Sequence, residues 1–161
     1  MSTTPAMRFL RAAGVPVEVH PYRYEARGGT RVSARELGVQ EHAVIKTLVL
    51  QDDTGRLLLM LMHGDREVSL KALARTLDAR RITPAAAAAA RRATGYEFGG
   101  TSPFGTRQPL ATYVERSILA LPRIYINGGA RGLLVSLSPQ VLTDVLGAEP
   151  VEVAIAPESR C

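Results

Sequence analysis

A glycine-rich stretch, T-G-Y-E-F-G-G-T-S-P-F-G over residues 94–105, contains the first residues whose types could support chemistry. Gly99 and Gly100 allow the backbone to approach a ligand closely, and consecutive N–H groups can form a concavity for an anion or oxyanion. Thr101 and Ser102 add two hydroxyl groups directly after them. The same composition is also typical of a surface turn, so the stretch alone leaves both interpretations open.

Lysine is rare in this chain, because only Lys46 and Lys71 are lysines among the 20 lysine and arginine residues. Lys46 lies in the apolar run 44–51, where strand alternation would place it in a row with Val44 and Leu48. An ammonium in such a row either reaches solvent or loses part of its solvation, which lowers its pKa. The second case would suit catalysis or ligand binding.

Histidine and cysteine give no comparable signal. His20, His42 and His63 lack a spacing typical of metal ligands, so we expect no metal site. The single cysteine, Cys161, is the last residue, where we expect an untethered tail rather than a nucleophile. Phosphate-binding, dinucleotide-binding and serine-hydrolase motifs are absent from the sequence, so no cofactor is expected.

Composition bounds the class of protein. A chain of 161 residues with 46% hydrophobic residues is expected to form a single domain over 1–161. The net charge of +5 fits RNA or a phosphorylated substrate as partner, and ordinary solubility charge equally well. Arginines 27, 31 and 131 are the basic loop residues that could approach such a partner, although the loop that contains Arg27 and Arg31 could also be only solvated. Neither a membrane span nor a secretion signal is seen, which favours the cytoplasm.

Helices and hairpins are expected to position these groups. In the first half we predict a helix from Pro5 ended by Gly14, a strand over 15–22, a flexible basic loop over 27–31, a helix capped by Ser33, and a hairpin of strands 44–51 and 56–63. In the second half we predict a helix capped by Ser69, a helix from Thr83-Pro84 through the alanine run to Gly95, strands over 111–115, 123–127 and 133–137, a helix from Ser138-Pro139 to Gly147, and a strand over 151–156.

Asn127 to Gly132 reads as a second glycine-rich turn, in which Gly128 and Gly129 favour a tight hairpin. Arg131 within it could point toward the same cleft as the first glycine-rich stretch. Because hairpins dominate and regular βαβ alternation is missing, we predict an α+β fold with a curved mixed sheet and surrounding helices.

Several of these segments together resemble a known family. H-P-Y at 20–22, the strand V-I-K-T-L-V-L, the 94–105 stretch and I-Y-I-N-G-G-A-R-G-L resemble the YbaK/EbsC family of aminoacyl-tRNA deacylases, which is related to the editing domain of bacterial prolyl-tRNA synthetases. The resemblance covers nearly the whole chain. It implies a strongly curved, partly barrel-like mixed sheet and the clearance of mischarged tRNA, most typically cysteine on tRNA(Pro). Prolyl-tRNA synthetase would be a further partner.

The resemblance also implies roles for particular residues. Lys46 matches the essential lysine of the family, and Tyr22 matches a tyrosine that lines its pocket. The candidate catalytic residues are Lys46, Gly100, Thr101 and Ser102, and the candidate substrate-binding residues are Tyr22, Gly99, Pro103, Phe104, Gly128, Gly129 and Arg131. In cysteine-specific members the thiol of the substrate attacks its own ester and leaves a cyclic thiolactone, which would explain why the chain lacks a nucleophile–base pair.

Two positions depart from the pattern of the cysteine-specific members. Gly29 stands where an aromatic residue is common, and Val141 stands where an acidic residue is common. Both departures leave the amino acid that is removed open. A binding module for tRNA ends or a synthetase, without chemistry, and a hydrolase of small esters are the alternative functions.

Overall fold

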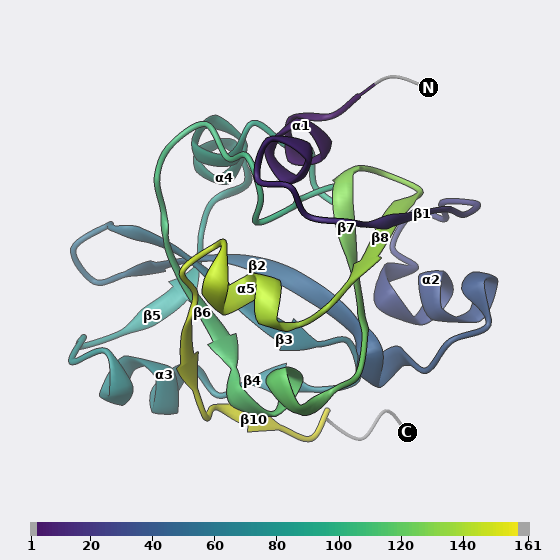
Figure 1. Cartoon of the computed structure of the whole chain (residues 1–161). Helices are drawn as coiled ribbons and strands as arrows, with labels where there is room; N and C mark the ends of the chain where they lie inside the picture. Colours follow the sequence, from purple (N-terminus) through teal and green to yellow (C-terminus); the bar gives the residue numbers. More distant parts are fainter. Residues whose placement is uncertain (1–2, 158–161) are drawn as a thin grey trace.

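The structure of the chain, a computed structural model, describes residues 3–157 (Figure 1). Cys161, expected to be an untethered tail, lies outside the described residues. One mixed sheet of eight strands forms the centre, in the order β1-β8-β7-β2-β3-β6-β9 with β5 paired to β2. Its strands are β1 (Glu18–Pro21), β2 (Val44–Asp52), β3 (Leu57–His63), β5 (Ile82–Pro84), β6 (Ala111–Glu115), β7 (Ile124–Ala130), β8 (Leu133–Leu137) and β9 (Glu149–Val151). A short second sheet pairs β4 (Glu67–Val68) with β10 (Ala154–Ile155).

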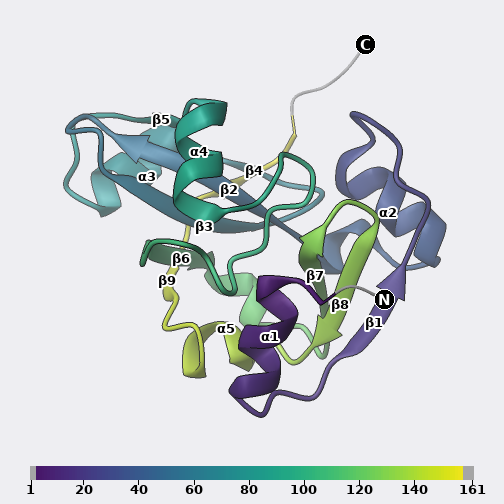
Figure 2. The ribbon, with the colours of Figure 1, turned by 90° about the horizontal axis from the view of Figure 1, so that it is seen from above.

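The sheet mixes parallel and antiparallel pairs. The hairpins β2–β3 and β7–β8 are antiparallel, whereas β2 pairs with β7, β3 with β6 and β6 with β9 in parallel. Figure 2 shows the β7–β8 end of the sheet turned away from the β2–β3 end, so the sheet is curved. The prediction of an α+β fold with a mixed sheet and surrounding helices is confirmed.

The β2–β3 hairpin lies at the centre of the core, as its two apolar runs predicted. Alternate residues of β3 enter different apolar clusters: Leu61 packs with α1 (Pro5–Ala12) and α5 (Gln140–Asp144), whereas Met60 and Met62 pack with α3 (Leu70–Thr76). Because the strand is covered on both faces, its sequence is continuously apolar rather than alternating.

Local capping signals located two helices correctly. The Thr4 side chain accepts a hydrogen bond from the Met7 N–H at the start of α1, and Ser69 does the same for Ala72 at the start of α3. Two short 3₁₀ helices, η1 (Glu41–Ala43) and η2 (Arg116–Ala120), precede β2 and follow β6.

Three predicted boundaries are wrong. The helix α2 (Gly29–Leu37) begins inside the predicted basic loop, so Ser33 is buried within the helix and is not its cap. Residues 82–84 form the strand β5, because Pro84 pairs with Leu50 of β2, and the helix α4 (Ala87–Thr94) begins only afterwards. The predicted strand over 151–156 is divided between β9 and β10.

The second glycine-rich turn is also placed differently. β7 continues through Gly128 and Gly129 to Ala130, with an irregular register between Asn127 and Ala130. The chain reverses direction only after the end of β7, at residues 131–132. The two glycines therefore form a bulge in a strand and not the hairpin turn itself.

Candidate active site

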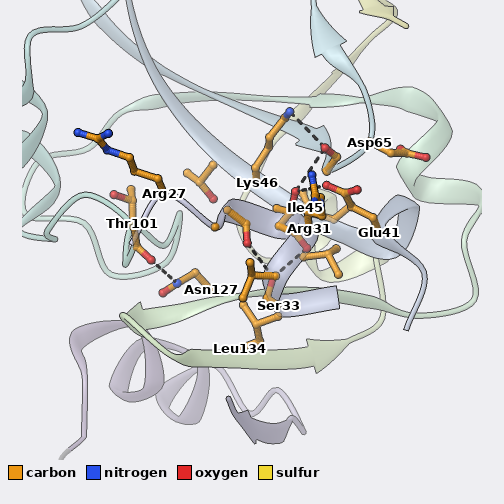
Figure 3. Close-up of a pocket in the computed structure, with 18 of the residues that line it drawn as sticks. Arg27, Arg31, Ser33, Glu41, Ile45, Lys46, Asp65, Thr101, Asn127 and Leu134 are labelled. Carbon is orange, nitrogen blue, oxygen red and sulfur yellow. Dashed lines mark hydrogen bonds between the residues drawn. The ribbon is translucent and has the colours of Figure 1, made fainter. Parts of the chain in front are cut away.

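A cavity of about 840 Å³ opens beside the first half of β2 (Figure 3). Its floor is formed by residues 44–48 of β2, and its walls come from segments that are distant in sequence. These segments are the chain from Tyr22 to Ser33, the turn 64–67 after β3, the loop residues 98, 99 and 101, and Asn127 of β7. Single residues from three other places, Glu41 of η1, Leu134 of β8 and Pro157, complete the lining.

Lys46 lies on this floor, between Val44 and Leu48 on the same face of β2. Its Nζ donates a hydrogen bond of 3.4 Å to the carbonyl oxygen of Gly64. Burial lowers the pKa of Lys46, and the charges of Glu67, Glu41 and Asp65 oppose that shift. The ammonium of Lys46 is therefore partly desolvated and does not extend freely into bulk water. This is the second of the two cases that the strand pattern left open.

The acceptor of Lys46 is itself fixed by close packing. Thr30 Oγ1 lies 2.7 Å from Glu41 Oε2 and 3.3 Å from the Gly64 carbonyl oxygen. A Cβ atom on Gly64 would lie 2.5 Å from Thr30 Oγ1, so glycine is required for the turn after β3 to approach α2. Lys46, the turn and the start of α2 therefore form one connected unit.

The loop opposite, residues 97–100, is held from behind by β7 and the turn after it. Asn127 Nδ2 donates to the Gly99 carbonyl oxygen at 3.2 Å, and Arg131 Nε donates to the Phe98 carbonyl oxygen at 2.8 Å. A Cβ atom on Gly100 would lie 2.9 Å from the Arg131 backbone nitrogen. The glycine at position 100 therefore permits a close approach of two backbones.

The N–H groups at positions 100–102 differ in whether they already donate a hydrogen bond within the protein. The Gly100 N–H donates to the Glu97 carbonyl oxygen at 2.9 Å, so it is not free to bind an oxyanion. Within the described residues, the N–H groups of Thr101 and Ser102 have no hydrogen-bond acceptor. Of these three residues, Thr101 lines the cavity.

The structure brings only some of the candidate residues to the cavity. Lys46, Tyr22, Gly99 and Thr101 line it, together with the arginines 27 and 31. Burial raises the pKa of the Tyr22 hydroxyl. The remaining candidates do not line it: Gly100, Ser102, Pro103, Phe104, Gly128, Gly129 and Arg131.

Two of these residues that do not line the cavity have clear packing roles. Ser102 is fully buried, and its Oγ accepts a hydrogen bond from the Phe104 N–H at 3.2 Å. Phe104 is also fully buried and stacks on Phe9 with 5.9 Å between ring centroids. Their side chains support the loop and do not face the cavity, because a closed core surrounds them.

The two positions that depart from the family pattern differ in their surroundings. Gly29 lines the cavity with a φ of 58°, and a Cβ atom there would meet nothing within 4 Å. Val141 is part of α5 and packs against the largest apolar cluster, so it does not line the cavity. Only Gly29 therefore bears on the shape of the pocket.

Sequence spacing missed a cluster of His42, His63 and Asp65, whose candidate ligand atoms lie within 4.8 Å of one another. His63 donates from Nδ1 to the His42 carbonyl oxygen at 2.7 Å, and its Nε2 lies 2.7 Å from Ser117 Oγ. Both ring nitrogens of His63 are thus engaged by protein groups. Nδ1 of His42 lies 2.8 Å from Asp65 Oδ1, and the two imidazole rings stack at 3.7 Å. These contacts fit an internal hydrogen-bond network better than a metal site.

Three further residues at the site were missed. Thr47 Oγ1 is buried, lines the cavity and has no hydrogen-bond partner within the part of the chain that the structure describes. Asn127 and Phe98 were named only as members of glycine-rich stretches. Asn127 carried a usable signal, because an asparagine before two glycines often accepts backbone hydrogen bonds, as its Oδ1 does from Gly129 and Ala130.

The comparisons with known proteins agree with this geometry. Residues 28–145 match the family described as the aminoacyl-tRNA editing domain, a match that covers most of the chain. The chain belongs to the aminoacyl-tRNA editing domain family. A protein of this kind from Enterococcus faecalis, described as a candidate Cys-tRNA(Pro)/Cys-tRNA(Cys) deacylase and called EbsC, is 24% identical over 93% of this chain and 92% of its own length.

Solved structures share the editing-domain fold. A candidate trans-editing enzyme for prolyl-tRNA synthetase superimposes with a TM-score of 0.82 at 23% identity, covering 97% of this chain and all of the other. A hypothetical protein superimposes with a TM-score of 0.85 at 23% identity over 94% of this chain and 99% of its own. Within residues 3–157, no helix of this editing domain is long and apolar enough to cross a membrane.

Proposed function

We propose that this chain is a freestanding deacylase that acts in trans in the cytoplasm and removes cysteine from mischarged tRNA(Pro). The observation that carries the proposal is the half-buried ammonium of Lys46 on the floor of a cavity whose opposite wall is the 97–100 loop followed by Thr101. The editing-domain family supports the reaction class. The name of the EbsC relative supports the choice of cysteine, and that of the trans-editing enzyme supports a link to prolyl-tRNA synthetase.

Lys46 holds the terminal adenosine or polarises the ester carbonyl. An ammonium has three donors, and one long bond to the Gly64 carbonyl leaves the others for substrate. Because burial has removed part of its hydration, its charge acts strongly on a nearby carbonyl oxygen. The Thr101 N–H stabilises the developing oxyanion, a role that contributes about 2.7–4 kcal/mol per donor. Gly100 supports that role through its turn hydrogen bond and not as a donor to substrate.

The substrate supplies the nucleophile. The cysteine thiol loses its proton, and its sulfur attacks the carbonyl carbon of its own ester. A carbon–sulfur bond forms as the carbon–oxygen bond to the terminal ribose breaks, and the ribose oxygen takes up a proton. The products are the cyclic thiolactone and tRNA with a free 3′ end. This route needs no serine or cysteine nucleophile from the protein.

The first test is deacylation of cysteinyl-tRNA(Pro) by purified protein in single-turnover reactions. We expect Lys46→Ala to slow ester loss by at least about tenfold, the change for a loss of one charged hydrogen bond. Lys71→Ala is the matched control, because Lys71 is an exposed lysine of α3. Equal rates for Lys46→Ala and the unmutated chain would remove Lys46 from the mechanism.

The amino acid and the route are tested with substrate analogues. A tRNA(Pro) that carries S-methylcysteine has no free thiol, so it should survive incubation with the enzyme, while the cysteinyl form releases a thiolactone. If the S-methyl form is cleaved as fast, water and not the thiol is the nucleophile. Because Gly29 leaves the pocket wall open, alanyl- and seryl-tRNA(Pro) belong in the same panel.

Two other functions make different predictions. A binding module without chemistry would retain tRNA and cleave no aminoacyl ester in the panel. A hydrolase of small esters would cleave esters that carry no RNA. Its rate would respond weakly to salt, because its substrates carry few phosphates to neutralise. Running the panel at two salt concentrations separates these three functions.

A further inference from the structure

Phe98 is an exposed aromatic residue at the edge of the cavity. Its side chain is 81% exposed, and only Phe98 and Ile155 are exposed large hydrophobic residues within residues 3–157. It also lines the cavity beside Gly99. A single exposed phenylalanine is not unusual in itself, so its support by the backbone decides whether it has a role.

The backbone beneath Phe98 is fixed on three sides. The Gly100 N–H closes a turn onto the Glu97 carbonyl, Arg131 Nε binds the Phe98 carbonyl, and Asn127 binds the Gly99 carbonyl. The Arg131 guanidinium in turn lies over the Tyr24 ring at 5.4 Å. The turn 97–100 therefore presents the Phe98 ring to solvent on a rigid support.

A second hollow, of about 330 Å³, lies on the other side of this turn. Its lining contains three arginines and one carboxylate: Arg91, Arg92, Arg107 and Glu97. Arg91 lies 3.7 Å from Glu97, whereas Arg92 and Arg107 have no ion pair within the described part of the chain. Since Glu97 lines this hollow and Phe98 lines the main cavity, the turn is the boundary between the two.

We propose that the turn 97–100 is the crossing point for the unpaired 3′ end of an RNA. The Phe98 ring stacks on a nucleobase, and the guanidinium groups of Arg91, Arg92 and Arg107 contact the phosphates that precede it. The terminal nucleotide then enters the cavity that holds Lys46. That this RNA is the acceptor end of tRNA rests on the proposed function.

The chemistry of the two surfaces favours a single-stranded nucleic acid. An aromatic ring next to a basic groove binds unpaired nucleotides with little dependence on sequence, because every base has a face to stack and every linkage has a phosphate. Arg27 and Arg31 also line the cavity and are exposed, but the large exposed aromatic ring belongs to the turn that follows α4. The proposal therefore places the entry of the RNA at α4 and not at α2.

Binding of RNA that carries no amino acid tests the proposed crossing point at the turn 97–100 directly. The probes are an acceptor-stem hairpin with an unpaired 3′ end and the same hairpin trimmed to a blunt end, with affinity measured by fluorescence anisotropy. We expect Phe98→Ala to weaken binding of the first probe by roughly fivefold to 150-fold, the range for loss of one stacked base, and to leave the second unchanged. Phe98→Trp should restore the affinity.

The arginines are tested by salt dependence. We expect the triple variant R91Q/R92Q/R107Q to reduce the slope of log affinity against log salt by roughly 2, about 0.7 for each phosphate that the variant no longer neutralises. The matched control is R75Q/R80Q/R81Q, which removes three exposed arginines at or after α3. In Figure 1, α3 is drawn below β2 and α4 is drawn above it. The control should keep the slope of the unmutated chain.

Three outcomes would overturn the proposal that RNA crosses at the turn 97–100. One is an unchanged affinity of Phe98→Ala for both probes, which would instead favour a protein partner for the exposed ring. Another is an equal loss on the blunt hairpin, and a third is an equal effect of the two arginine triples. Because the RNA is uncharged, failure of deacylation on every aminoacyl-tRNA would remove the proposed function and leave these binding results standing.

Discussion

Thr47 carries a buried hydroxyl oxygen that the described part of the chain leaves without a hydrogen-bond partner. Such a group costs about 1–3 kcal/mol when it is left unpaired. Its position on the cavity floor, next to Lys46, offers it a partner on the substrate. A residue that lowers stability and lines the cavity is the kind that binding would justify.

We expect Thr47→Val to separate stability from activity. Valine has nearly the same shape, so the free energy of unfolding should stay constant or rise by about 1 kcal/mol, while deacylation falls about tenfold because no hydroxyl remains to bind the substrate. Urea denaturation and single-turnover rates measure the two quantities. A fall in stability above about 1 kcal/mol would mean that the hydroxyl has a partner in the folded protein.

His63 links the stability of the fold to pH. Burial lowers its pKa below the ordinary value of 6.5, and the proton of the neutral ring lies on Nδ1 because the His42 carbonyl can only accept. The unfolded chain therefore binds a proton at a pH at which folded His63 does not. The contribution of His63 to stability falls as the pH drops below 6.5 and levels off below its pKa in the folded state.

We expect the free energy of unfolding to fall between pH 7.5 and pH 5, with His63 contributing a slope of at most about 1.4 kcal/mol per pH unit. His63→Asn should lower stability at neutral pH and remove this part of the slope. His20→Asn, which removes a histidine outside the cluster, should keep it. Denaturant titrations across the range decide the point, and an unchanged slope in His63→Asn would contradict it.

At the scale of elements, Glu115 joins the end of β6 to the C-terminal segment. Its side chain is buried, and its Oε1 accepts hydrogen bonds from the N–H groups of Val153 at 2.7 Å and Ala154 at 2.9 Å. These bonds hold the chain between β9 and β10 against the sheet. One carboxylate oxygen thus replaces the strand pairing that is interrupted there.

We expect Glu115→Ala to lower the free energy of unfolding by about 3 kcal/mol, because one buried and one partly buried N–H group lose a charged acceptor. Glu115→Gln keeps an acceptor oxygen and should lose about 1 kcal/mol. Glu152→Ala is the control, since its ion pair with Arg116 is exposed and should contribute under about 1 kcal/mol. Amide exchange at residues 153 and 154 would show whether the loss is local, and full protection in Glu115→Ala would contradict this role.

Elements that depend on local signals were predictable from the sequence. Thr4 and Ser69 cap their helices through bonds within one turn, and the β2–β3 hairpin follows from two apolar runs around a turn. The strand β5 was not predictable, because Thr83-Pro84 has the form of a helix start and becomes a strand only by pairing with β2. Its assignment depends on a partner more than thirty residues away.

The candidate site was predictable in part for the same reason. Lys46 is identified by its rarity and its apolar strand, both of which are local features. The network of His42, His63 and Asp65 is formed by η1, β3 and the turn after it, so no spacing rule predicts it. Phe98 was overlooked because its exposure is a property of the folded surface.

At the scale of the whole molecule, the core clusters share strands. β3 contributes Leu61 to one cluster and Met60 to another, and the eight-stranded sheet is continuous across both. Neither cluster can lose its packing without disturbing the other, because the shared strand would have to move. On the basis of this coupling we propose that the chain is a single domain, as the sequence predicts.

We therefore expect one cooperative unfolding transition. The calorimetric and van't Hoff enthalpies should agree, and circular dichroism and tyrosine fluorescence should give coincident transitions. Tyrosine is a suitable probe because the chain has five tyrosines and no tryptophan. Two separated transitions would contradict a single domain.

The parallel pairing of β2 with β7 has a consequence for synthesis on the ribosome. Ile45 lies opposite Ile126, so the strand that carries Lys46 gains this neighbour only after 81 further residues have been translated. Until then the apolar β2–β3 hairpin lacks β7 beside β2, and before residues 111–115 are translated it also lacks β6 beside β3. Such long-range pairing slows folding and leaves strand edges open to aggregation. A nascent chain that stalls before residue 124 would lack β7 and, with it, the Asn127 side of the site.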